Sequence, residues 1–325
     1  MTELTDITNR QVRVAITGGT GFVGAALARE LLGERHEVVL VARRARTHMP
    51  DGAQLAPVGL ADRRALRGAF ADCDAVAHLA GINRERGRQT YQAVHVDGTA
   101  NVVAAAAEAG VKRIVMLSFL RARPGCGSAY HESKYQAEQI VRASGVPHTI
   151  LKSGVIYGRG DHLLDHLSHA LFTLPLFATV GRRQPPLRPI AVRDVVRVLR
   201  ASLLTNRLEN RTLAVTGPEE LTMRQVVERV ARVIGRRAYI LPLPVAFHRT
   251  LAAVAEAAMD VPLVSRAQVR MLAEGLCQPT GDVDPLPENL RPTTRFADDE
   301  IRAGLPAPGP FTCAHLSLSF TAEAT

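Results

Sequence analysis

The sequence predicts an α/β protein built on a doubly wound parallel sheet, with a smaller, mostly helical lobe toward the C-terminus. Three observations predict this class. Short apolar runs alternate with helical patterns from residue 13 onward, the connections between them are short, and a glycine-rich turn joins the first run to the first helix. Strands that alternate with helices form parallel sheets covered on both faces, so we expect that arrangement here.

The first half of the chain supplies most of the expected elements. A buried strand over 14–17 precedes a helix over 25–32, and Asp62 is placed to cap the helix over 61–70. An alanine-rich helix over 91–110 ends at Gly110. The other elements expected in this half are strands over 36–42, 74–81, 112–118 and 148–158, and a helix over 132–144.

After residue 160 the alternation weakens. The run 162–177 predicts one or two apolar helices, and 187–203 predicts a strand and a helix that return to the main sheet. A strand over 211–217 precedes a helix in which Thr222 and Gln225 have capping-box spacing and which ends at Gly235. Residues 242–305 are expected to form the smaller helical lobe.

Composition sets broad limits on function. The chain has 325 residues, of which 46% are hydrophobic and 22% charged, and it contains no run of about 18 apolar residues that would span a membrane. The first ten residues lack the apolar segment of a secretory signal, so we expect a cytoplasmic protein. Four scattered cysteines favour neither a disulfide framework nor a zinc site. The net charge of +9 favours anionic ligands, but aromatic residues are 4% and no nucleic-acid reading motif is present, so nucleic acid is not an expected partner.

The glycines of the first turn predict a phosphate-binding loop. Gly18, Gly21 and Gly24 lie in a G-x-x-G-x-x-G spacing between the first strand and the first helix. Glycine permits a sharp turn and a close approach of the backbone to a pyrophosphate, and the helix N-terminus supplies amide donors. The alternative is a plain turn. We therefore expect a dinucleotide-binding domain over 11–157 and 186–216, a substrate or partner lobe over 158–185 and 217–310, and flexible tails at 1–10 and 311–325.

Tyr130 and Lys134 are the candidate catalytic pair. They are four residues apart, so a helix places them on one face. An ammonium near a phenol lowers the pKa of the phenol, which would let Tyr130 transfer a proton while Lys134 holds the ribose of a nicotinamide nucleotide. The Y-x-x-x-K pattern is common by chance, and its place about a hundred residues after the glycine turn favours this role.

The end of the second strand indicates which nucleotide is bound. An acidic residue at that place would bond the ribose hydroxyls of NAD, but here the residue is Ala42, followed by Arg43 and Arg44. A guanidinium can pair with a 2′-phosphate through two hydrogen bonds, so we predict NADP(H) over NAD(H). The alternative is that both arginines are solvated surface charges.

The segments TGGTGFVG, HLAG and YHESK resemble motifs of the short-chain dehydrogenase/reductase superfamily, in its extended and atypical branches. The resemblance covers residues 12–305. The C-terminal part looks most like the subgroup of the NAD(P)H-binding accessory subunit of respiratory complex I and its bacterial epimerase-like relatives. The resemblance implies a Rossmann-type domain whose cofactor contacts are Thr17, Gly18, Gly21, Phe22, Val23, Gly24, Leu79, Ala80, Gly81 and Lys134.

Several positions depart from the pattern of that superfamily. Phe119 stands where the catalytic serine is usual, which leaves its neighbour Ser118 as the candidate, or as a strand-end hydroxyl bonded to backbone. His95 replaces an asparagine. The usual R-P pair after a later strand is Lys152 and Ser153, and an aspartate that contacts adenine is replaced by Gly59.

Other features have structural alternatives. His162, His166 and His169 share helical spacing but no ligand pattern completes a metal site, so we predict no metal. Asp194 is expected to cap a helix, Arg188 to meet an anionic substrate group or solvent, and Tyr157 to be a pocket candidate. The apolar run 241–264 could be a lid, a partner surface or a membrane-touching helix, and core packing is the favoured interpretation.

The combined interpretation is an NADP(H)-dependent oxidoreductase that exchanges hydride with a carbonyl or alcohol, with Tyr130, Lys134 and Ser118 as catalytic residues. A sugar-nucleotide epimerase or dehydratase is the neighbouring alternative. The second alternative is a structural or redox-sensing protein that binds NADPH without turnover. The expected partner is an apolar or anionic small molecule, with association at a membrane surface or a respiratory complex left open.

Overall fold

The computed structural model describes residues 11–44, 49–258 and 266–311, and it divides the chain into two compact units. Unit 1 comprises residues 1–153, 192–215 and 278–292, and unit 2 comprises 154–191, 216–277 and 293–325. The segment 278–292 was expected in the smaller lobe. It lies in unit 1 because the amide of Asp284 donates to Thr212 O (2.7 Å) and the amide of Thr280 donates to Leu120 O (3.1 Å).

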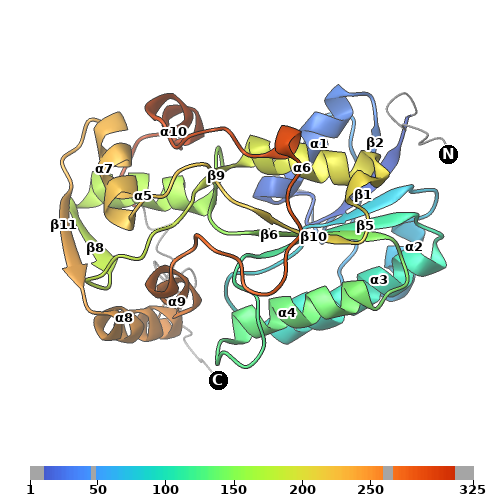
Figure 1. Cartoon of the computed structure of the whole chain (residues 1–325), viewed down its shortest axis with the longest axis horizontal. Helices are drawn as coiled ribbons and strands as arrows, with labels where there is room; N and C mark the ends of the chain where they lie inside the picture. The colour runs from blue at the N-terminus through green and yellow to red at the C-terminus, as the bar shows by residue number, and fades with distance from the viewer. Residues whose placement is uncertain (1–10, 45–48, 259–265, 312–325) are drawn as a thin grey trace, which may run out of the picture. The chain divides into compact units, whose positions relative to one another are not determined.

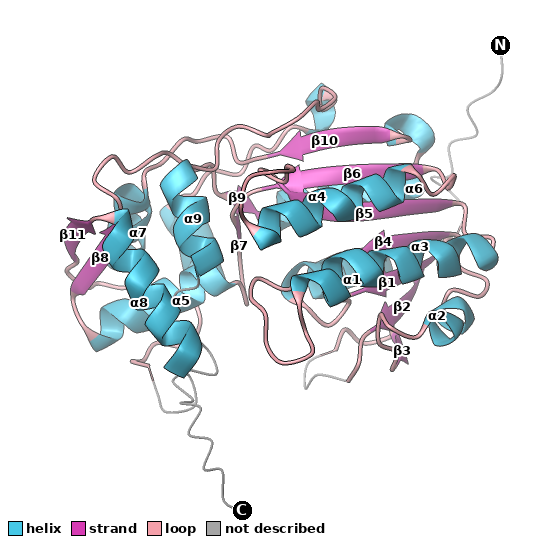
Figure 2. Ribbon diagram, turned by 90° about the horizontal axis from the view of Figure 1, so that it is seen from below, coloured by secondary structure: helices cyan, strands magenta, loops and turns pink. Residues whose placement is uncertain are grey.

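Unit 1 is built on a seven-stranded parallel sheet, which confirms the predicted fold class. The strands run in the order β10-β6-β5-β4-β1-β2-β3 (Figures 1 and 2). They are β1 (Arg13–Thr17), β2 (Glu37–Val41), β3 (Gln54–Ala56), β4 (Ala75–His78), β5 (Arg113–Phe119), β6 (His148–Ser153) and β10 (Arg211–Val215).

Helices cover both faces of this sheet. Helices α1 and α6 pack together on one face, and α2, α3 and α4 lie side by side on the other (Figure 1). Their bounds are α1 (Phe22–Gly33), α2 (Arg63–Ala69), α3 (Gly98–Glu108), α4 (Ala129–Arg142) and α6 (Val192–Leu204), and single 3₁₀ turns span Asn206–Leu208 and Glu288–Leu290. Because both faces are covered, Val14, Ala15 and Ile16 of β1 are all fully buried.

The predicted helix over 91–110 is interrupted. Residues Gln92–Asp97 form a π-helical segment before α3 begins at Gly98, and the chain leaves the helix at Gly110 with a φ of +72°. Such bulges widen a helix locally and are frequent at functional sites. This one contains His95.

Unit 2 contains two short two-stranded sheets and five helices among its described residues. Strand β7 (Ile156–Tyr157) pairs with β9 (Ile190–Ala191), and β8 (Leu176–Val180) pairs with β11 (Tyr239–Leu243). The helices are α5 (His162–Thr173), α7 (Met223–Val233), α8 (Val245–Ala258), α9 (Arg266–Glu274) and α10 (Asp298–Gly304).

Two expectations for this part of the chain were wrong. The strand expected within 187–203 is only the two-residue β9, which pairs with β7 rather than with the main sheet, so α6 alone returns to unit 1. The apolar residues after 173 form strand β8 instead of continuing the helix. The break follows from Pro175, which disfavours helical geometry at Leu174.

Side chains cap several helices as expected. Asp62 accepts from the amide of Ala65 at the start of α2, and Thr222 and Gln225 form a reciprocal capping box at α7. Asp194 does not cap α6, because that helix begins two residues earlier. It lies in the first turn, 3.4 Å from the guanidinium of Arg197.

Candidate functional site

The predicted site residues gather at one edge of the unit 1 sheet. Strands β1 and β4 are neighbours and pair Thr17 with His78 at their carboxyl ends. The chain leaves β1 toward α1 on one face and β4 toward α3 on the other, so the strand order reverses here. A crevice at such a point is where parallel α/β sheets bind ligands.

The glycine turn is packed too tightly for side chains. Gly18 has a φ of +71°, and a Cβ atom there would lie 2.9 Å from the Ala80 backbone. A Cβ at Gly24 would lie 2.4 Å from the Gly18 carbonyl oxygen. These positions therefore require glycine, because the loop from β1, the start of α1 and the loop after β4 touch through their backbones.

Helix α1 begins at Phe22 with its first turn available to an anion. Gly21 is the N-cap residue, no side chain caps the helix, and no acidic residue lies in its first turn. The amide groups and the positive end of the helix dipole point out of this end of the helix. This arrangement suits a phosphate group.

Tyr130 and Lys134 lie together near the loop after β4. Both belong to α4, one helical turn apart, and both are buried. A Cβ at Gly81 would lie 3.1 Å from Nζ of Lys134, so the ammonium lies directly against this loop. The structure therefore brings Tyr130, Lys134 and Gly81 to the same edge as the glycine turn.

The acid–base properties of the pair differ from the sequence expectation. Burial raises the pKa of the Tyr130 phenol, and the neighbouring Tyr91 raises that pKa further. Burial lowers the pKa of Lys134 to about 8, against the opposing effect of the Glu138 carboxylate. Tyr130 is therefore a protonated phenol at neutral pH, because burial disfavours the charged phenolate.

Ser118 is not brought to Tyr130. Its hydroxyl donates to Oε1 of Glu138 at 2.6 Å, and the β5 side chain that contacts Tyr130 is the ring of Phe119, with centroids 5.2 Å apart in an edge arrangement. Ser118 and Phe119 thus contact different turns of α4, so the β5 residue beside the phenol is an apolar ring and not a hydroxyl.

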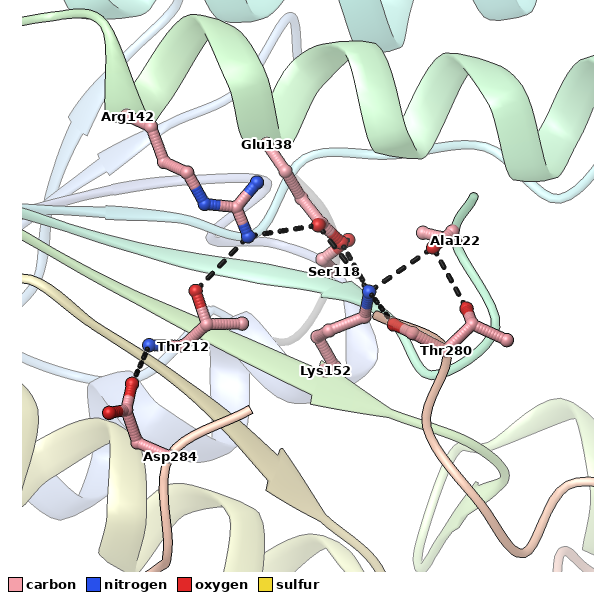
Figure 3. A network of polar contacts seen from close by, with 8 residues as sticks. All are labelled: Ser118, Ala122, Glu138, Arg142, Lys152, Thr212, Thr280 and Asp284. Carbon is pink, nitrogen blue, oxygen red and sulfur yellow. Dashed lines mark hydrogen bonds and ion pairs between the residues drawn. The ribbon is translucent and has the colours of Figure 1, made fainter. Parts of the chain in front are cut away.

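Lys152, the residue found in place of the usual arginine, belongs to the same network as Ser118. Its Nζ donates to Ala122 O (3.2 Å), Thr280 O (2.8 Å) and Glu138 (3.4 Å) (Figure 3). Arg142 also donates to Glu138, at 3.2 Å. The network borders a pocket of about 580 Å³ in unit 1. Within this network the carboxylate of Glu138 is paired with the side chains of Lys152 and Arg142.

A chain of buried hydrogen bonds that the sequence did not predict joins the glycine turn to the π-helical segment. Thr99 donates to His95 O, so its oxygen accepts from Nε2–H of His78, which leaves Nδ1 of His78 to accept from Thr17. Burial lowers the pKa of His78 to about 3, with the Lys134 charge as a smaller cause. His78 is therefore a neutral bridge between the two segments.

His95 makes a second link, to α4. The amide of Ile82 donates to Nε2 of His95 at 3.0 Å, so Nδ1 carries the proton and donates to Oγ of Ser133 at 2.9 Å. Oγ of Ser133 donates in turn to Tyr130 O. Burial, with the Lys134 charge, lowers the pKa of His95 to about 2, so its ring remains neutral. The spacing of residues 78, 95 and 99 in the sequence did not predict this arrangement.

Arg43 and Arg44 are exposed, and only Ala42 separates them from the end of β2. The stem of Arg43 lies over Gly59, whose hypothetical Cβ would be 3.8 Å from Cγ of the arginine. Residues 42–44 thus bring two arginines and no carboxylate to the carboxyl end of β2.

Unit 2 uses the remaining candidates structurally. Tyr157 is buried, donates to Arg295 O at 2.9 Å and packs edge-on against Phe296, so it is not a pocket residue. Arg188 pairs with Glu220 at 3.4 Å. The rings of His166 and His169 lie beside that of Phe311, and within the described residues no group of His, Cys, Asp or Glu is placed to hold a metal.

The backbone cradle at Gly18 and Gly24, with the uncapped start of α1, fits a dinucleotide pyrophosphate, and it lies at the point where the strand order reverses. These features are typical of dinucleotide-binding α/β folds. Comparison with known proteins agrees: residues 18–163 match a family model described as NAD(P)H-binding. This part of the chain is thus similar to NAD(P)H-binding proteins, and its predicted resemblance to the short-chain dehydrogenase/reductase superfamily is confirmed.

Two similar proteins match different shares of the chain. An uncharacterized protein of Mycobacterium bovis is 30% identical over 259 residues, which are 80% of this chain and 27% of that protein. The chain thus spans about a quarter of that relative. The mitochondrial 40 kDa subunit of NADH-ubiquinone oxidoreductase from Neurospora crassa is 26% identical, over 60% of this chain and 51% of the subunit.

The fold is shared with solved structures. UDP-glucuronic acid 4-epimerase from Bacillus cereus, solved in complex with NAD, superposes with a TM-score of 0.67 over 90% of this chain and 97% of the epimerase, at 16% identity. This likeness concerns the fold alone.

Proposed function

We propose that the protein is an NADP(H)-dependent oxidoreductase of the short-chain dehydrogenase type, which exchanges hydride with a carbonyl or alcohol substrate. The observation that carries the proposal is the buried pair Tyr130 and Lys134, placed beside Gly81 at the edge of the sheet that holds the glycine turn. A bound nicotinamide would supply the hydride exchange. A protein that only held the nucleotide would not need this pair.

Different residues of the chain would bind different parts of the nucleotide. Gly18, Gly21 and Gly24, with the amides of Phe22 and Val23, would hold the pyrophosphate. Leu79, Ala80 and Gly81 would line the crevice after β4, and Thr17 would fix the turn through His78. Lys134 would hold the ribose.

Tyr130 would act as the proton donor. Its raised pKa keeps the phenol protonated at neutral pH, which suits the reduction of a carbonyl, because the developing alkoxide must receive a proton. Ser118 takes no part in this proposal, since its hydroxyl is bonded to Glu138. Phe119 presents an apolar ring instead, which favours a substrate with an apolar group near the carbonyl.

The preference for NADP(H) rests on Arg43 and Arg44. Both are exposed after β2, where an acidic residue would repel a 2′-phosphate. Charge-assisted bonds to a phosphate contribute roughly 1.5–3 kcal/mol, so Arg43→Glu is expected to weaken NADPH binding by roughly 10- to 100-fold and NADH binding much less. Equal losses for the two nucleotides would refute the preference.

The direct test is calorimetric titration of nucleotide-stripped protein with NADPH and with NADH at matched salt, followed by a panel of carbonyls monitored by NADPH absorbance. Tyr130→Phe is expected to lower kcat by roughly 100-fold or more while NADPH affinity stays within about threefold. An unchanged kcat would show that Tyr130 is not the proton donor.

A second candidate is a protein that binds NADPH without turnover, in association with a respiratory complex. The apolar ring of Phe119 at the place of the usual serine favours it, and so does the likeness to the 40 kDa subunit. This candidate predicts tight NADPH binding, no turnover of any carbonyl, and unchanged cellular function in the Tyr130→Phe variant. An epimerase or dehydratase would instead interconvert a nucleotide sugar with no net consumption of added NADPH.

A further inference from the structure

The apolar run 241–264 is not a core segment where the structure describes it. Leu241, Phe247, Leu251 and Val254 are 48%, 50%, 46% and 59% exposed. Residues 259–265 lie outside the described part of the chain. The expectation of core packing was therefore wrong for these four residues, and their exposure needs another explanation.

Strand pairing adds residues from a distant part of the sequence to the same surface. In the parallel register of β8 and β11, Tyr239 pairs with Leu176 and Leu241 pairs with Ala178. Leu176, Tyr239 and Leu241 therefore point to one face of this sheet, and each is about half exposed or more.

Helix α8 continues this surface. Val180, on the same face of β8, packs against Ala252 of α8 and Val269 of α9, so these helices cover only the carboxyl end of the face. Both views show α8 beside β8 and β11 (Figures 1 and 2). Phe247, Leu251 and Val254 are spaced four and three residues apart and form one exposed stripe. We call Leu176, Tyr239, Leu241 and this stripe the apolar face.

Arginines flank the apolar face at both ends of the sheet. Arg182 and Arg183 follow β8, Arg236 and Arg237 precede β11, and all four are exposed. The segments 174–193 and 229–255, which contain the sheet and α8 as far as the residue before Glu256, hold no aspartate or glutamate. The charged side chains of these two segments are thus all cationic.

We propose that the apolar face binds the surface of an anionic lipid bilayer, with its apolar side chains in the interfacial layer and the flanking arginines on lipid phosphates. Apolar side chains beside a basic rim are the chemistry of interfacial binding. A second copy of the chain fits less well, because a two-fold interface over this face would bring arginines against arginines. Among the described residues no helix is long and apolar enough to cross a bilayer.

The test is co-sedimentation of the full chain with vesicles of phosphatidylcholine alone or with added phosphatidylglycerol, at low and high salt. Binding is expected only with phosphatidylglycerol and is expected to weaken at high salt. Arg182→Gln/Arg183→Gln is expected to lower binding by roughly 10- to 30-fold, since each basic residue near such a surface contributes about 1 kcal/mol. Tyr239→Ser/Leu241→Ser is expected to lower it by roughly tenfold or more.

Arg64→Gln/Arg67→Gln is the matched control, because it removes the same charge from exposed positions of α2 in unit 1. This variant is expected to bind vesicles nearly as the unmodified chain does, and all variants are expected to keep their NADPH affinity. Equal losses in both arginine variants would overturn the proposal, because they would indicate a general charge effect. So would absence of vesicle binding, or a dimer in light scattering that Tyr239→Ser/Leu241→Ser dissociates.

Discussion

The network of Ser118, Glu138, Lys152 and Arg142 predicts an asymmetric response to mutation. Lys152 and Glu138 are 2% and 1% exposed, and the pair is completed by Arg142 and the Ser118 hydroxyl on the carboxylate side (Figure 3). Burial lowers the pKa of Lys152, while Glu138 opposes that shift. The ammonium therefore depends on the carboxylate to remain charged inside the protein.

Breaking a buried pair costs about 3–5 kcal/mol of unfolding free energy, because the remaining charge is left uncompensated. Lys152→Met leaves Glu138 with Arg142 and Ser118, so we expect a loss near the lower value. Glu138→Leu leaves Lys152 with two carbonyl oxygens and near Arg142, so we expect a loss near the upper value. The double variant is expected to lose several kcal/mol less than the sum, because no charge remains unpaired at either position.

Urea unfolding followed by circular dichroism measures these differences. Lys112→Met is the control, because Lys112 pairs with Asp74 at 2.9 Å but is 64% exposed, and such pairs contribute at most about 1 kcal/mol. If Lys152→Met costs no more than Lys112→Met, or if the two single losses simply add, then the buried pair does not stabilise unit 1 in the way argued.

Three further predictions concern the nucleotide edge. Gly24→Ala places a Cβ 2.4 Å from Gly18 O. Calorimetry should therefore show NADPH affinity lowered by at least tenfold, and the free energy of unfolding should fall by about 1–3 kcal/mol. Gly33→Ala is the control on the same helix, because a Cβ there meets nothing within 4 Å, and it should lower neither quantity. His78→Phe leaves buried hydroxyls of Thr17 and Thr99 without their bridge, and urea unfolding should show a loss of about 1–3 kcal/mol. The pKa of Lys134 falls from 10.5 to about 8 on folding, so the unfolded chain binds more protons between these values, and stability should rise by about 3 kcal/mol across that pH range in the unmodified chain relative to Lys134→Met.

The sequence predicted the fold of unit 1 because its signals are local. Apolar runs of four to seven residues, helix caps such as Asp62, and the glycines of the first turn each specify structure within a few residues. Strand β8 and the segment 278–292 could not be found in this way. Each is defined by pairing with a distant strand, β11 or β10, and neither has a period of its own.

The residues of the candidate site also differ in whether a local sequence pattern relates them. Tyr130 and Lys134 are related by one helical turn, so their spacing alone placed them together. His78 and His95 act through Thr17, Thr99 and Ser133, partners that lie 4 to 61 residues away, and no spacing rule connects them.

The position of Ser118 shows why register decides the chemistry of this site. A strand offers alternate residues to one face, so the sequence could narrow the residue beside Tyr130 to Ser118 or Phe119 but could not choose between them. In the structure the Ser118 hydroxyl donates to the buried carboxylate of Glu138, and the Phe119 ring lies against Tyr130. Replacing Glu138 would therefore free the hydroxyl of Ser118 without moving it to Tyr130, whereas Phe119→Ser would place a hydroxyl beside the phenol. If a serine there polarises the substrate carbonyl, Phe119→Ser should raise kcat for carbonyl reduction while Glu138→Leu should not.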